Sequence, residues 1–151
     1  MLDLIHAYEN YLVKVKQAST NTVSSYLRDI RQFDGWLGGS VLDASQQNIR
    51  AYLTYLQEQG KSGATVSRSL ASLKNFYAYA VSSGFLDVSP VSGQIHIDRG
   101  ERRLPQILTG REVELLLSQP SSSDFKGVRD KAMLEVMYAT GIRVSELIDL
   151  N

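Results

Sequence analysis

The 151-residue sequence contains no cysteine, only three prolines and no excess of charge of either sign. The missing cysteines exclude a disulfide framework and a thiolate metal site, and neither histidine has a partner at a metal-ligand spacing. No apolar run reaches about 18 residues, so we expect no membrane-spanning helix. The first residues lack the basic start and apolar core of a signal peptide. These absences favour a cytoplasmic protein with no metal site and no membrane partner.

The charge balance bears on the class of partner. Sixteen basic and sixteen acidic residues give a formal net charge of zero. A basic excess is the usual mark of a nucleic-acid-binding protein, so this balance counts mildly against one. However, one basic face can bind phosphates while acids lie on the opposite face. Residues 61–74 fit that pattern, because they contain Lys61, Arg68 and Lys74 and no acidic residue.

Apolar residues recur at helical spacing through the first part of the chain, and no strand-like alternation precedes residue 90. The pattern predicts a first helix over about 2–16 and a second that begins with Thr20 as its N-cap and ends before Gly38. A third helix follows Ser45 and a fourth follows Ser62. In the first helix, one apolar face comprises Ile5, Tyr8, Leu12 and Val15. Short loops between four such helices predict a compact all-α bundle over residues 1–87.

The composition changes over residues 88–108, where Pro90 and Pro105 interrupt regular structure and Arg99, Arg102 and Arg103 cluster. We interpret this segment as an interdomain linker. A second domain is expected over residues 109–151. Its first helix begins at Thr109, which has capping-box spacing to Glu112. Another helix is predicted over about 125–139.

The most informative motif is Ala-Thr-Gly-Ile-Arg-Val-Ser-Glu-Leu at residues 139–147, in which Arg143 precedes Glu146 by one helical turn. This motif resembles the one that carries the first catalytic arginine of the tyrosine site-specific recombinases, in their Xer-like and phage-integrase-like branch. The resemblance extends along the whole chain. The other matching segments are 19–26 with Asp29 and Phe33, 68–77, 103–112 and 129–133. Their common order and spacing make the resemblance specific.

The resemblance implies a two-domain clamp on DNA. Residues 1–87 would form the SAM-like core-binding domain, and residues 109–151 would form the first helices of the catalytic domain. In this family a tyrosine attacks the scissile phosphate and forms a 3′-phosphotyrosyl link, so no metal or nucleotide cofactor is implied. The implied partners are double-stranded DNA with inverted-repeat half-sites and other recombinase protomers, which form a tetramer on DNA.

A physical reason supports a catalytic role for Arg143. Attack on a phosphodiester builds negative charge on the non-bridging oxygens, and a guanidinium offers a planar fork of donors that stays charged. Glu146, at i+3, is expected to orient that guanidinium. The alternative is that Arg143 and Glu146 form only an exposed ion pair, which contributes little to stability.

The remaining catalytic elements of the family cannot be assigned in this sequence. His96 and Arg99 have the family's His-x-x-Arg spacing, but they precede Arg143 instead of following it. All eight tyrosines lie on predicted helices before Arg143, where an aromatic residue is usually part of the core. We therefore expect a fragment, truncated after the first arginine motif, that binds DNA but forms no covalent DNA adduct alone.

The expected DNA contacts lie on the second and fourth helices and in the linker. Short polar and basic residues at these places suit phosphate contacts. Helix capping, or an ordinary solvated face, is the alternative for each of them. The linker arginines would follow the DNA backbone. The complete set of candidates is Thr20, Asn21, Thr22, Ser25, Lys61, Ser62, Thr65, Arg68, Lys74, Arg102 and Arg103.

Two other functions stay open at this point. The chain could be a non-catalytic DNA-binding module, such as a truncated competitor that occupies recombination sites. It could also be a helical protein–protein interaction module, which the zero net charge favours. In addition, the apolar faces after residue 101 are expected to self-associate or to be partly mobile, because exposed apolar surface of that size tends to find a partner.

Overall fold

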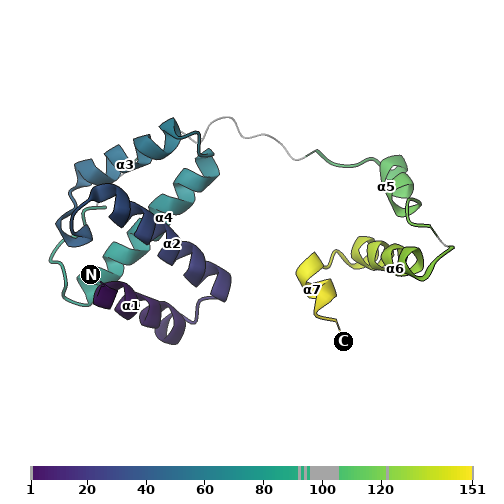
Figure 1. The fold of residues 1–151 in the computed structure, drawn as a ribbon, viewed down its shortest axis with the longest axis horizontal. Coiled ribbons are helices and arrows are strands. Elements are labelled where there is room, and N and C mark those ends of the chain that lie inside the picture. Colours follow the sequence, from purple (N-terminus) through teal and green to yellow (C-terminus); the bar gives the residue numbers. More distant parts are fainter. Residues whose placement is uncertain (1, 92, 94, 96–105, 122, 151) are drawn as a thin grey trace. The chain divides into compact units, whose positions relative to one another are not determined.

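The computed structural model describes residues 2–91, 93, 95, 106–121 and 123–150. Within these residues the regular structure is helical and contains no strand, which confirms the predicted all-α class. The chain divides into two compact units, Met1–Arg102 and Arg103–Asn151 (Figure 1). Across the described ranges, no helix has the length and apolar character that crossing a membrane requires.

The N-terminal unit is built around its longest helix. Its elements in chain order are α1 (Leu2–Asn10), the π-helix η1 (Tyr11–Val15), α2 (Thr20–Leu37), the short 3-10 helix η2 (Val41–Asp43), α3 (Gln46–Glu58) and α4 (Gly63–Ser82). Helix α4 contacts both α2 and α3. It also contacts α1, because the Tyr8 hydroxyl donates a hydrogen bond to Asn75 Oδ1 at 3.0 Å.

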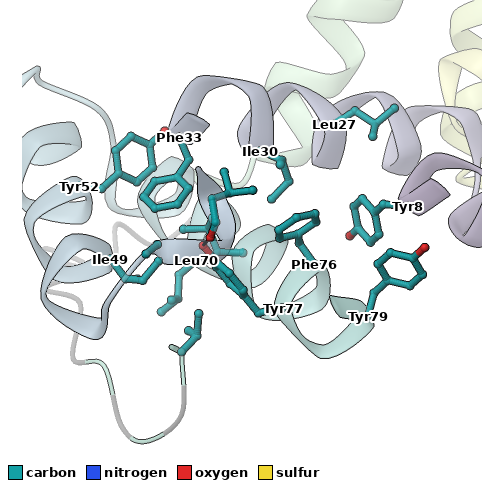
Figure 2. Packing of buried hydrophobic residues seen from close by; sticks show 14 of the residues in the cluster. Tyr8, Leu27, Ile30, Phe33, Ile49, Tyr52, Leu70, Phe76, Tyr77 and Tyr79 are labelled. Carbon is teal, nitrogen blue, oxygen red and sulfur yellow. Dashed lines mark hydrogen bonds between the residues drawn. The ribbon is translucent and has the colours of Figure 1, made fainter. Parts of the chain in front are cut away.

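The core of this unit is rich in aromatic side chains (Figure 2). The Tyr8 and Phe76 rings meet edge to face, with centroids 5.2 Å apart, and those of Phe33 and Tyr52 lie 5.0 Å apart. The buried Tyr77 hydroxyl donates a hydrogen bond to the Val41 carbonyl at 2.7 Å. Apolar residues at i, i+3 and i+4 on α3 and α4 are buried, which is the pattern of helices that pack one face against a core.

The prediction for the first helix is wrong in its last turn. Residues 11–15 form a π-helix, in which the Lys16 amide donates to the Tyr11 carbonyl at 3.0 Å. Val15, which was expected on the inner face, is 68% exposed. The extra residue of a π-turn rotates the following side chains away from the core. Apolar spacing alone does not distinguish this turn from a regular one.

The N-cap predicted for the second helix is also corrected. Ser19 has extended backbone angles and its hydroxyl accepts a hydrogen bond from the Thr22 amide, so Ser19 is the N-cap. Thr20 is the first helical residue. Serine and threonine both serve as N-caps, and the backbone angles show that Ser19 takes the position here.

The C-terminal unit contains α5 (Gly110–Leu117), α6 (Phe125–Thr140) and α7 (Val144–Ile148). The predicted capping box is confirmed, because the Thr109 amide donates to Glu112 Oε2 at 2.7 Å and the Glu112 amide donates to Thr109 Oγ1 at 3.4 Å. The bond from the Thr109 amide lowers the pKa of Glu112. Among the described residues of this unit, Gly127 is the only buried one. These three helices therefore bury no apolar core of their own.

Candidate nucleic-acid interface

The candidate residues on α2 begin at a capped and exposed helix terminus. The Ser19 hydroxyl accepts from the Thr22 amide at 3.3 Å and lies 2.9 Å from the Thr22 hydroxyl. Thr20 and Asn21 are exposed, whereas Thr22 and Ser25 are half-buried. The first turn of a helix also presents backbone N–H groups without intrahelical partners. Thr20 and Asn21 therefore lie free for an external ligand, while Thr22 takes part in the cap.

Helix α4 begins with the same cap as α2. The Ser62 hydroxyl accepts from the Thr65 amide at 3.2 Å and lies 3.0 Å from the Thr65 hydroxyl. Lys61 is exposed immediately before this cap. Both helices thus begin with a serine and carry a threonine three residues later. The capping interpretation holds for Ser62 and Thr65, and it is compatible with a phosphate contact through the backbone amides.

The most constrained candidate is Arg68, which forms an ion pair across the α2–α4 contact. Its Nη1 atom lies 3.2 Å from Asp29 Oδ1. The carboxylate is buried, since the Asp29 side chain is 3% exposed, whereas the Arg68 side chain is 37% exposed. Nη1 makes no well-directed hydrogen bond, so charge attraction holds the pair. The second carboxylate oxygen of Asp29 accepts a hydrogen bond from the Ser72 hydroxyl at 2.7 Å.

This ion pair borders a buried polar cluster. The Tyr52 hydroxyl of α3 lies beside the Ser69 hydroxyl of α4, and neither forms a hydrogen bond of good geometry. Burial raises the pKa of Tyr52 to about 12, and the nearby Asp29 carboxylate adds to that increase. Charged or polar groups of α2, α3 and α4 therefore meet beside Arg68.

The two basic candidates of α4 do not share a face. Lys74 follows Arg68 by six residues, which corresponds to about 240° around an α-helix. Lys74 is exposed, and Arg68 lies at the contact with α2. Thr65, Arg68 and Ser72 do lie on one face, because they are three and four residues apart. A single flat ligand would meet Arg68 and Lys74 at different edges of the helix.

The arginine motif forms the turn between α6 and α7. Helix α6 ends at Thr140, and its C-cap Gly141 has a φ of +67° and donates its amide to the Met137 carbonyl at 2.9 Å. Two residues later Arg143 occupies the N-cap position of α7. The Thr140 hydroxyl accepts from the Ile142 amide at 3.3 Å and thereby fixes the short segment between the helices.

Glu146 holds Arg143 through both of its carboxylate oxygens. Oε2 accepts from the Arg143 backbone amide at 2.8 Å, and Oε1 lies 3.2 Å from Arg143 Nη1. A guanidinium has no acceptor, so the reciprocal half of a capping box is not formed here. The Arg143 side chain is 81% exposed, and an ion pair at such exposure adds little stability. The arrangement orients the guanidinium and leaves most of its surface accessible.

The linker candidates Arg102 and Arg103 lie outside the described residues, and so do Arg99 and the rejected His96. Sequence reasoning also missed the burial of Asp29 and its contacts with Arg68 and Ser72. A signal for Asp29 was present, because it stands among the core positions Leu27, Ile30 and Phe33. A carboxylate at such a position needs a charged or hydrogen-bonding partner.

Comparison with known proteins gives two family matches. Residues 5–84 match the phage integrase N-terminal SAM-like domain, and residues 106–151 match the phage integrase family. The chain is 41% identical to tyrosine recombinase XerD of Shewanella oneidensis, an alignment that covers 98% of this chain and 50% of the relative. It is 36% identical to tyrosine recombinase XerC of Roseiflexus castenholzii, with 100% and 49% covered. The chain thus spans about half the length of the curated relatives it matches.

Proposed function

Because the chain belongs to the phage integrase family of tyrosine site-specific recombinases, we propose that it acts in site-specific DNA recombination. Its N-terminal unit, with a domain boundary near residue 87, binds double-stranded DNA that carries inverted-repeat half-sites. Its partners on that DNA are other recombinase protomers. Residues 109–151 contribute a phosphate-binding arginine to the catalytic domain and a surface for self-association.

One observation carries the DNA-binding part of this proposal. The N-terminal unit buries its apolar faces in its own core, while Thr20, Asn21, Lys61 and Lys74 stay exposed on α2, on α4 and just before α4. These residues are donors or cations of the kind that contact DNA phosphates. The unit is thus folded around its own core and carries its candidate phosphate ligands on its surface.

Arg143 is proposed to bind the scissile phosphate. As a phosphodiester is attacked, negative charge grows on its non-bridging oxygens, and a guanidinium donates two parallel hydrogen bonds to such oxygens. Glu146 contacts Arg143 at one terminal nitrogen and leaves most of the side chain accessible. Glu146 therefore acts as a positioning residue, which sets the direction of the guanidinium without occupying its whole donor edge.

The test of DNA binding is fluorescence anisotropy across a salt series, with an inverted-repeat duplex typical of the family and a scrambled duplex. Each phosphate contact adds a slope of about −0.9 to the plot of log affinity against log salt concentration. We expect Lys74→Ala to reduce the slope by about that amount. Arg50→Ala, an exposed arginine on α3, serves as the matched control. The absence of any salt-sensitive affinity for DNA would contradict the proposal and favour a helical protein–protein interaction module.

A further inference from the structure

Asp29 is the one acidic residue among the buried side chains of the described part of the N-terminal unit. It lies on α2 at a position where the helix faces α4, and it is 2% exposed. A carboxylate in such a place is costly unless it is paired and hydrogen-bonded. Both of its oxygens are engaged by α4, one by Arg68 and the other by Ser72. The burial of this charge therefore requires Arg68 at a defined position.

Arg68 is divided between the protein interior and the solvent. Its Nη1 atom is buried against Asp29, yet 37% of the side chain is exposed. A guanidinium has five N–H donors in a fixed planar fork, and the single contact at Nη1 leaves donors uncommitted. Because the fork is rigid, holding one nitrogen in place restricts the direction of the others.

We propose that Asp29 is a positioning residue for DNA binding, which anchors one nitrogen of Arg68 so that the outer donors of the guanidinium take a backbone phosphate. This inference rests on the proposed DNA-binding function and adds a role for a residue that has the same sign of charge as the ligand. Ser72 completes the anchor, since its hydroxyl fixes the second oxygen of Asp29. Arg68 and Lys74 then contact DNA at different edges of α4.

The physical gain from this arrangement is entropic. A free arginine side chain loses rotamer freedom when it binds a phosphate, and this loss opposes binding. The ion pair with Asp29 imposes that loss during folding, before DNA arrives. The remaining positive charge of Arg68 still acts on the phosphate, because the exposed part of the side chain is turned to the solvent.

The direction in which one substitution changes the DNA affinity distinguishes this positioning role from a purely electrostatic effect. Removing a negative charge near a polyanion strengthens binding when only the overall field matters. With Asp29→Asn we expect the opposite, a DNA affinity lower by about threefold to tenfold, because the anchor is lost. Glu58→Gln, which removes an exposed charge from α3 of the same unit, is expected to leave the affinity unchanged or slightly higher.

A double-mutant cycle provides the second test. Asp29→Asn is combined with Arg68→Lys, which keeps the charge but removes the planar fork. We expect Asp29→Asn to weaken binding in the wild-type background and to cause no weakening in the Arg68→Lys background. Circular dichroism and thermal unfolding of each variant establish that it is folded. If Asp29→Asn does not fold, Ser72→Ala replaces it, with an expected loss of affinity of about twofold to fivefold.

Each outcome of the anisotropy measurement has a defined meaning. Wild-type protein without salt-dependent DNA binding would overturn the proposed function and this inference together. Wild-type binding with Asp29→Asn equal to or tighter than wild type would overturn the inference alone and reduce the pair to a structural ion pair. Weakened binding by Asp29→Asn that persists unchanged in the Arg68→Lys background would also overturn it, because the effect would not pass through Arg68.

Discussion

At the scale of single residues, the buried tyrosines determine how the N-terminal unit responds to alkali. Burial raises the pKa of Tyr52 to about 12 and also raises the pKa values of Tyr8 and Tyr77. An unfolded chain releases these protons near pH 10, which is the ordinary value for a tyrosine. Above that pH the folded state holds more protons than the unfolded state, so the free energy of unfolding falls.

We predict that stability is independent of these tyrosines below pH 10 and declines from pH 10 to pH 12. The expected slope is about 1.4 kcal/mol per pH unit for each of these three tyrosines. Urea unfolding at a series of pH values measures it, and Tyr52→Phe should make the decline shallower. Tyr138→Phe, which removes a tyrosine that is 65% exposed, is the matched control. A decline as steep in Tyr52→Phe as in wild type would contradict the assignment.

Arg143 allows a residue-scale test of the proposed chemistry in a full-length recombinase that carries this segment. Arg143→Lys keeps the charge but loses the planar fork. We expect DNA cleavage to fall by about 100-fold with the DNA affinity nearly unchanged, because the lost donor acts on charge that develops in the transition state. The control is Arg129→Lys, which alters an exposed arginine that pairs with Asp130 on α6. Equal cleavage by wild type and Arg143→Lys would remove Arg143 from the reaction.

At the scale of elements, the sequence predicted helices better than it predicted their ends. The inner faces of α3 and α4 follow directly from apolar spacing, and each helix has a clear serine cap. The predicted end of the first helix was wrong, because a π-turn and an α-turn place apolar residues at similar intervals. The expectation that helical tyrosines are core residues also fails at Tyr138, since α6 has little to pack against within the described residues.

Gly127 provides a test of how α6 begins. A Cβ atom at this position would overlap the Ser121 backbone carbonyl, and the Gly127 amide donates to Asp124 Oδ1 at 2.6 Å. Alanine improves helix propensity by about 1 kcal/mol, but the overlap costs about 1–3 kcal/mol. We therefore predict that Gly127→Ala displaces the turn around Ser121 and lowers stability. NMR chemical shifts of residues 121–128 would report the displacement.

The control for this substitution is another glycine in the same unit. Gly110 is the first residue of α5, and a Cβ atom there meets no atom within 4 Å. Gly110→Ala should therefore not reduce the stability of its helix. If Gly127→Ala leaves the chemical shifts of residues 121–128 at their wild-type values, the close approach of the Ser121 carbonyl to position 127 does not constrain this turn.

At the scale of the whole molecule, the two units differ in how they bury apolar residues. The N-terminal unit has a continuous core, whereas the C-terminal unit leaves its large apolar side chains exposed. These exposed residues include Leu115, Leu116, Phe125, Val128, Val136 and Tyr138. Exposed apolar surface of this kind favours association with another surface.

We predict that the chain self-associates through residues 106–150. Light scattering should show a mass that rises with protein concentration, and Phe125→Ser together with Leu116→Ser should lower that mass. Val88→Ser, at an exposed apolar residue of the N-terminal unit, is the control. A monomeric mass at all concentrations would contradict the prediction.

The candidate site could be predicted from the sequence only in part, because some of its contacts depend on how the whole unit packs. Arg143 and Glu146 are three residues apart, so their contact follows from helix geometry alone. Asp29 and Ser72 are 43 residues apart, and their hydrogen bond exists only because α2 packs on α4. Contacts between distant helices depend on the packing of whole faces, which no local pattern specifies.

The π-helix η1 has a consequence for how this chain tolerates changes of length. A π-turn contains one residue more than an α-turn needs. Deleting one residue after Leu12 would convert it into a regular turn and leave the buried Tyr8 and Leu12 in place. The altered side chains would be those of Val13 to Lys16, which are exposed. The junction between α1 and α2 is therefore a point at which we expect the chain to tolerate the loss of one residue.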